Sequence, residues 1–125
     1  MIDVGKLPGD FRDYIDVESC LKRVAGNQAI LIRLLKSFLD NGTVEQLMTQ
    51  ISRGDIDGAA MTAHGIKGIS GNLSLTGLYN NVVELESQLK QGKAEGALMD
   101  EFLATSEKTR KYLLQLIESS DGGRN

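Results

Sequence analysis

The chain has a single histidine, His64, and a lysine follows it three positions later, at Lys67. An exposed imidazole can take up a proton, bind a metal ion or act as a nucleophile, and a nearby ammonium group can neutralise a phosphate. Three glycines, Gly65, Gly68 and Gly71, accompany the pair although the surrounding pattern is helical. Together they lower the stability of a helix by about 2–3 kcal/mol relative to alanine. We therefore expect these glycines to serve access to the imidazole.

The helical phase of this stretch separates a buried face from an exposed one. At about 100° per residue, one arc of about 120° collects the apolar and small residues, which are Ala59, Ala63, Ile66, Ile69, Ser70 and Leu73. His64 lies about 160° from the centre of that arc, so its ring is expected to point to solvent. The same exposed side carries five residues predicted to form a docking surface for another protein: Asp57, Ala60, Met61, Gly68 and Gly71.

Such a surface suits phosphoryl transfer better than hydrolysis. Hydrolytic catalysis requires a pocket, a second activated group and hydrogen-bond donors for an oxyanion, and a convex helix face supplies none of these. It can instead present one ring nitrogen to a phosphoryl donor held by another protein. Lys67, one turn away and about 60° around the helix, is placed to offset the phosphate charge.

Length, composition and charge exclude several other classes of protein. The 125 residues, 41% of them hydrophobic, predict a single domain with one modest core. The chain contains no run of about 18 apolar residues, which a membrane span would require, and it does not open with a charged-then-apolar leader. A net charge of -3 without a basic cluster argues against nucleic acid as a partner. The lone Cys20 fits a reducing cytoplasm, and one histidine and one cysteine predict no metal site.

The secondary structure that holds these side chains is predicted to be entirely helical. The only proline is Pro8, and no stretch after it alternates apolar and polar residues for long. Helices are expected over residues 16–26, 27–54, 55–73, 74–92 and 93–118, the second with a kink or restart at Asn41-Gly42. The expected N-caps are Asp16, Asn27, Asp55 and Ser74, and the expected helix ends are Gly26, Gly54 and Gly92.

Four long helices with short connections predict an all-α fold. The arrangement that buries all four apolar stripes is an antiparallel up-and-down four-helix bundle with a short additional N-terminal helix. Residues 16–118 are expected to form the bundle domain, residues 1–15 an N-terminal extension and residues 119–125 a flexible tail.

The motif Ala63-His64-x-x-Lys67-Gly68, followed by Gly71-Asn72-Leu73 and Leu85-Glu86, resembles histidine-containing phosphotransfer (HPt) domains of multistep phosphorelays. The resemblance extends from about Val17 to Tyr112. It implies that His64 takes a phosphoryl group on Nε2 from an aspartyl phosphate of one receiver domain and passes it to another. It also implies that Mg²⁺ is bound by the receiver, that this chain binds no cofactor of its own, and that it has no autonomous kinase activity.

Glu86 is the residue for which the resemblance and the helical phase point to the same role. In the family, a polar side chain from the following helix often hydrogen-bonds the active imidazole, and Glu86 occupies the matching position. Its place, about 40° from Val82 at the edge of the apolar stripe, lets it lean toward the neighbouring helix. A carboxylate accepting from Nδ1–H would leave Nε2 available and stabilise a charged ring. Many family members carry glycine at the position of Ser74, a change that we expect the N-cap role of the serine to compensate.

Two other functions stay open from the sequence. A non-catalytic helical adaptor would bind a partner through its exposed apolar residues and would not need His64. A dimerising phosphoacceptor helix pair of a sensor kinase fits less well, because that family usually has an acidic residue where Gly65 follows the histidine. The chain is expected to be cytoplasmic, without membrane contact, and monomeric as an isolated domain. It is either a separate protein or the C-terminal part of a membrane-bound hybrid sensor kinase.

Overall fold

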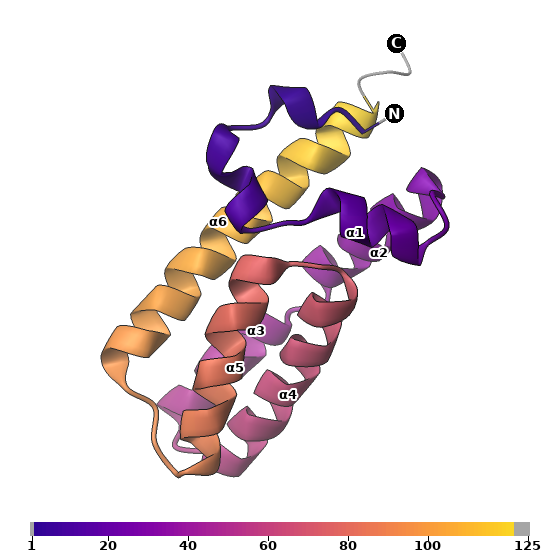
Figure 1. The fold of residues 1–125 in the computed structure, drawn as a ribbon. Coiled ribbons are helices and arrows are strands. Elements are labelled where there is room, and N and C mark those ends of the chain that lie inside the picture. The colour runs from indigo at the N-terminus through magenta and orange to yellow at the C-terminus, as the bar shows by residue number, and fades with distance from the viewer. Residues whose placement is uncertain (1, 122–125) are drawn as a thin grey trace.

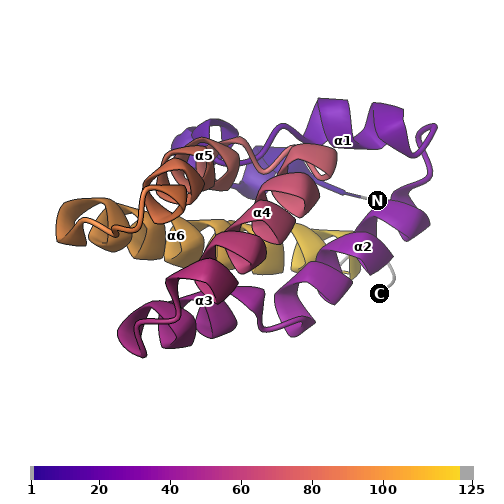
Figure 2. The same cartoon turned by 90° about the horizontal axis from the view of Figure 1, so that it is seen from below.

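The structure is a computed structural model that describes residues 2–121, and this part of the chain contains helices and no strands. The α-helices are α1 (Val17–Arg23), α2 (Gln28–Asp40), α3 (Thr43–Ser52), α4 (Ile56–Asn72), α5 (Thr76–Lys90) and α6 (Gly96–Asp121). Two short 3-10 helices precede them, η1 (Val4–Lys6) and η2 (Gly9–Asp13). Helix α4 packs between α3 and α5, and α5 packs in turn on α6. Figure 1 shows these helices running alongside one another and Figure 2 shows them from below, so the predicted all-α four-helix bundle is confirmed.

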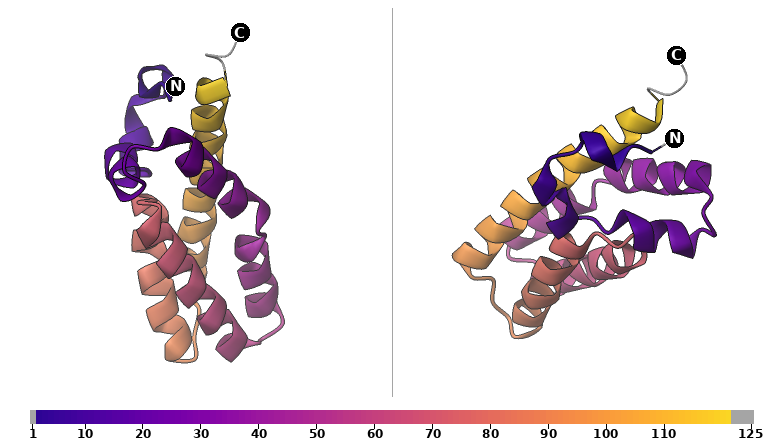
Figure 3. Two further views of the ribbon diagram at one scale, coloured as in Figure 1. Left: turned by 90° about the vertical axis from the view of Figure 1, so that its right-hand side faces the viewer. Right: turned by 45° about the horizontal axis from the view of Figure 1, so that its top comes forward.

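The first long helix predicted for the bundle, residues 27–54, is divided into α2 and α3, as the sequence predicts. The break falls at Asn41-Gly42, where Gly42 has a φ of 67°. Glycine adopts this left-handed conformation at no steric cost, so the chain can change direction and begin a new helix. The restart is visible in Figure 3.

Most of the predicted helix boundaries are confirmed by their hydrogen bonds. Three side chains each accept a hydrogen bond from a backbone N–H in the first turn: Asp16 from Ser19, Asn27 from Ile30 and Asp55 from Gly58. Each of these bonds satisfies one of the donors that a helix start leaves unpaired. The predicted terminating glycines all have positive φ: Gly26, Gly54 and Gly92. Gly54 and the Asp55 cap together fix where α4 begins.

The predicted N-cap role of Ser74 is wrong. Helix α5 begins at Thr76, and its N-cap residue, Leu75, makes no side-chain capping bond. Ser74 instead has a φ of 53° and serves the end of α4. There the Leu75 N–H donates to Ser70 O at 2.8 Å and the Ser74 N–H donates to Gly71 O at 3.3 Å. This pair of bonds closes a helix through one left-handed residue, which is why glycine suits the position.

The described part of the N-terminal extension, residues 2–15, packs on the bundle. Phe11 and Ile15 are buried in the core. The Tyr112 hydroxyl donates to Asp10 Oδ1 at 2.6 Å, and the Tyr14 ring meets Tyr112 edge-on. Figures 1 and 3 show this segment lying along the C-terminal half of α6. Short 3-10 turns carry no helical periodicity, so the sequence pattern did not reveal that they belong to the domain.

Both ends of the last helix differ from the prediction. Helix α6 begins at Gly96, three residues after the expected start, because the Gln88 side chain accepts from Glu95 N at 2.9 Å and prolongs the turn after α5. The helix continues to Asp121, and Ser119 Oγ accepts from Asp3 N at 3.1 Å. The first residues of the predicted flexible tail are therefore helical. The rest of that tail, residues 122–125, lies outside the described residues.

The predicted buried face of α4 is confirmed. Ala59, Ala63, Ile66 and Ser70 are fully buried. Two of them are alanines, whose small side chains let α4 lie close to its neighbours. Ile69 is only half-buried, at the edge of that face.

Candidate functional site

His64 lies near the middle of α4 on the side away from the core. Its side chain is 68% exposed, which confirms the predicted direction of the ring. The neighbouring turns bury Ala63 and Ile66 on the opposite face. The backbone of a packed helix therefore fixes the base of the side chain while its imidazole stays within reach of another molecule.

The ring is held from the neighbouring helix by Glu86. The Nδ1 atom of His64 lies 2.8 Å from Glu86 Oε2, and the Glu86 side chain is only 4% exposed. The predicted hydrogen bond is confirmed. A carboxylate can only accept, so Nδ1 carries the proton and the lone pair of a neutral ring is on Nε2. That second nitrogen is the one that remains for chemistry.

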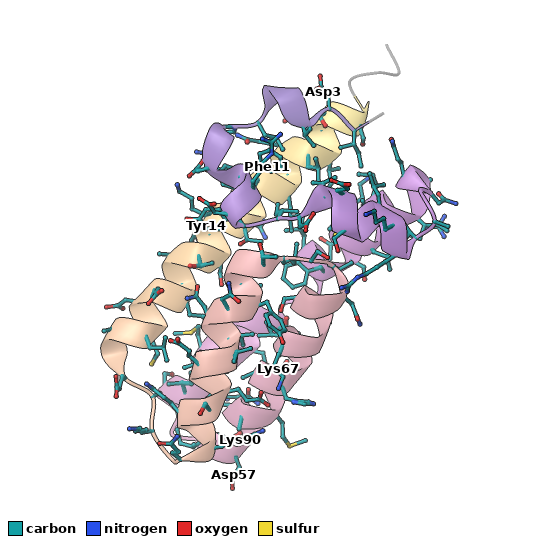
Figure 4. The ribbon with its side chains drawn as sticks, viewed as in Figure 1. Asp3, Phe11, Tyr14, Asp57, Lys67 and Lys90 are labelled. Atoms are coloured by element: carbon teal, nitrogen blue, oxygen red, sulfur yellow. The ribbon has the colours of Figure 1, made fainter. Side chains whose placement is uncertain are left out.

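Two lysines share the same carboxylate. Lys67 Nζ lies 2.7 Å from Glu86 Oε1, and Lys90 Nζ lies 3.4 Å from Glu86 Oε2. Lys67 is thus drawn toward α5 and is 30% exposed, whereas the helical phase placed it on the solvent side. Figure 4 shows the two lysines on α4 and α5 on one side of the molecule. Lys90 was not predicted, although its position four residues after Glu86 on one helix is the spacing of an ion pair.

These contacts settle the charge of Glu86. Burial alone would raise the pKa of this carboxyl, but hydrogen bonds from Lys67, His64 and Lys90 outweigh burial and lower the pKa below its ordinary value. Glu86 is therefore an anion at neutral pH. With a neutral ring, one negative and two positive charges surround the imidazole.

The three glycines after His64 have different surroundings. A Cβ atom on Gly65 or Gly68 would meet nothing within 4 Å. A Cβ atom on Gly71 would lie 3.3 Å from Cε1 of the Tyr79 ring on α5. The surface at Gly65 and Gly68 is therefore open, as predicted for the surroundings of the imidazole. At Gly71, the absence of a side chain makes room for α5.

The remaining residues of the predicted docking surface are exposed to different extents. Asp57 is exposed and Met61 is 78% exposed, while Ala60 is half-buried. Two exposed apolar residues on α5, Tyr79 and Val83, were not predicted. They fall on the exposed side of a helix whose rotation against α4 is known only from the packed structure.

Neither a metal-binding cluster nor a membrane-spanning helix is found among the described residues. Within residues 2–121, no group of three or more His, Cys, Asp or Glu side chains is placed to hold a metal ion. In the same part of the chain, no helix combines the length and the apolarity needed to cross a bilayer.

Comparisons with known proteins point in one direction. A family model described as "Hpt domain" matches residues 33–121. Among solved structures, the chain is similar to the HPT domain of the Hpt sensor hybrid histidine kinase from Shewanella, with a TM-score of 0.73 and 22% sequence identity. That match covers 83% of this chain and 93% of the other. A search of curated proteins gave no match.

Proposed function

The chain belongs to the Hpt domain family, and on that basis we propose that it accepts a phosphoryl group on Nε2 of His64 from a receiver-domain aspartyl phosphate and passes it to another receiver. The family acts in histidine phosphotransfer within phosphorelays. The donor, the acceptor and the role of each residue in this chain are parts of the proposal.

One observation supports His64 as the residue that accepts the phosphoryl group. Its ring is 68% exposed while Nδ1 is bound to a nearly buried carboxylate, Glu86. This combination leaves a single nucleophilic nitrogen facing solvent in a fixed orientation. A histidine that merely lay on the surface would not need a buried acid to orient it.

The proposed transfer needs no proton to move. The Nε2 lone pair attacks phosphorus, the bond from phosphorus to the aspartyl oxygen breaks, and its electrons return to the aspartate as a carboxylate. The proton on Nδ1 stays in place beside Glu86. Reversing these steps on a second receiver delivers the phosphoryl group.

The partner supplies the rest of the chemistry in this proposal. Mg²⁺ is expected on the receiver, where it neutralises the phosphoryl oxygens, and Lys67 adds a positive charge from this side. The receiver would cover the open surface around Gly68, with Asp57, Ala60 and Met61 at its border. We further propose that the domain is cytoplasmic and monomeric, and that the receivers it meets can include one of a hybrid sensor kinase.

The test is incubation of the chain with a panel of phosphorylated receiver domains. We expect at least one of them to transfer label to the chain, in an acid-labile and base-stable form that is absent in His64→Gln. Absence of label from every receiver, or equal label in His64→Gln, would contradict the proposal. The second result would favour the adaptor function, which does not require the histidine.

A further inference from the structure

A hollow of about 360 Å³ opens beside the break between α2 and α3, where these two helices face α6. No residue of α4, which the structure describes in full, lines this α3–α6 hollow, so it is separate from the surface around His64. Its volume falls within the range of small-molecule sites in proteins. Most of its lining is apolar and includes the side chains of Phe38, Leu39, Met48, Leu78 and Leu103.

Three charged side chains also line the α3–α6 hollow. Glu45 belongs to α3, whereas Glu107 and Arg110 belong to α6. Glu107 and Arg110 lie three residues apart on one helix, a spacing at which opposite charges can pair. Within residues 2–121, however, no ion pair or hydrogen bond joins the side chain of any of the three to another group. All three charges are therefore available to a ligand.

Uncharged polar groups of the same hollow also lack partners among the described residues. Asn41 Oδ1 accepts from the N–H and the hydroxyl of Thr43 at 3.1 and 3.0 Å, which leaves the Asn41 NH₂ group as a free donor. The N–H groups of Val44 and Glu45, in the first turn of α3, are unpaired as well. Ser106 Oγ is buried without a hydrogen bond, although a helical serine can donate to a carbonyl one turn earlier. Because a buried polar group without a partner is unfavourable, these groups indicate a polar ligand.

We infer that the α3–α6 hollow binds a free apolar α-amino acid, a site beyond the proposed function because it does not involve His64. Such a ligand carries one carboxylate and one ammonium group beside an apolar side chain. Arg110 is suited to the carboxylate, since a guanidinium group can bind both of its oxygens. Glu45 and Glu107 are suited to the ammonium group. A carboxylic acid without an amine would face two like charges, and an amine without a carboxylate would leave Arg110 unpaired.

The test is a titration of the ¹⁵N-labelled full chain with L-phenylalanine, followed by NMR. We expect saturable shifts of the Val44 and Glu45 amide signals, because both residues line the hollow. Two probes with the same ring, 3-phenylpropanoate and 2-phenylethylamine, each lack one charge and should bind about tenfold more weakly, the effect of one charge-assisted hydrogen bond. L-Alanine keeps both charges without the ring and should also bind at least about tenfold more weakly. Equal binding of L-phenylalanine and either single-charge probe, or no saturable shift with L-phenylalanine, would overturn the inference.

Two variants locate the two ends of the ligand. Arg110→Gln should weaken the binding of L-phenylalanine and of 3-phenylpropanoate alike, by about tenfold, because it removes the partner of the carboxylate. Glu107→Gln should weaken the binding of L-phenylalanine but not that of 3-phenylpropanoate, which has no ammonium group. Lys111→Gln and Glu118→Gln remove exposed charges of the same helix outside the hollow, and these matched controls should bind like the wild type. Unchanged binding of L-phenylalanine in Arg110→Gln, or an equal loss in Lys111→Gln, would overturn the inference.

These titrations also separate the inference from the proposed function. They need no receiver, and His64→Gln should bind L-phenylalanine like the wild type because no residue of α4 lines the hollow. A failed titration and a failed receiver transfer are therefore distinct results. Because Glu107 and Arg110 are exposed, both variants should fold normally, so a loss of binding reports the lost charge.

Discussion

The ring of Tyr79 lies 3.3 Å from the place that a Cβ atom on Gly71 would occupy, whereas the same atom on Gly68, one turn earlier, would meet nothing within 4 Å. The absence of a side chain thus serves a different purpose at each of these two glycines of α4. Gly71 allows α5 to pack closely on α4. Gly68 keeps the surface beside His64 open.

This difference predicts that alanine stabilises the protein more at Gly68 than at Gly71. Gly68→Ala should raise the free energy of unfolding by about 0.5–1 kcal/mol, since alanine is the better helix former and the site is open. Gly71→Ala should gain less stability, because the Tyr79 ring must move.

Gly68→Gln should keep or raise stability while sharply reducing phosphotransfer, because the glutamine side chain blocks approach to the His64 ring. Melting curves and transfer time courses on the same proteins provide the test, and a destabilised Gly68→Gln that transfers normally would show that Gly68 serves packing.

Lys67→Ala should slow phosphoryl acceptance without abolishing it. The ammonium group offsets phosphate charge but makes no bond to phosphorus, and Lys90 remains beside Glu86 at 3.4 Å. Because Lys67 is partly exposed, its effect should shrink at high salt, where charges are screened. Transfer rates of the wild type and Lys67→Ala at low and high salt check this, and equal rates at low salt would leave Lys67 without a part in transfer.

The left-handed backbone at Ser74 predicts an unusual order of stability. Ser74→Ala loses the hydroxyl that donates to Ser19 Oγ at 3.1 Å and keeps the positive φ, so it should be less stable than the wild type. Ser74→Gly loses the same bond but adopts this φ without strain, and it should be more stable than Ser74→Ala by about 1 kcal/mol. Chemical denaturation of the two variants measures the difference. A glycine variant no more stable than the alanine variant would mean that the φ of Ser74 carries no strain.

The contact between Asp10 and Tyr112 predicts how stability depends on pH. The hydrogen bond from Tyr112, followed by that from Lys108, lowers the pKa of Asp10, and the bond to Asp10 raises the pKa of Tyr112. The Asp10 contribution is therefore present above the ordinary carboxyl pKa and is lost as pH falls through the lowered value. The Tyr112 contribution is present below about pH 10 and is lost as pH rises through the raised value.

Tyr112→Phe tests this contact. It should lower the melting temperature between these limits and flatten the alkaline decline of stability. Tyr79→Phe is the control on an exposed ring. The same pH profile in Tyr112→Phe and the wild type would contradict an N-terminal segment held to α6 through this bond.

The sequence predicts best what a single helix determines. The exposure of His64 follows from the phase of α4 alone, because its buried face is periodic. Glu86 could be placed because it lies at the edge of its own apolar stripe. Lys90 and Tyr79 could not, since their contacts depend on how α5 is rotated against α4. Ser74 was misassigned because a small polar residue between two helices can either cap the second or end the first, and only the backbone distinguishes these roles.

The proposed function requires that the chain receives a phosphoryl group on His64 and hands it on. The most direct measurement loads the chain from a labelled receiver, removes that receiver, and adds a second receiver with Mg²⁺. We expect label lost from the chain to appear on the second receiver. We expect His64→Gln, still folded because Glu86 keeps both lysines, to take up no label. Label that stays on the chain with every receiver tested, or that is released only as inorganic phosphate, would contradict it.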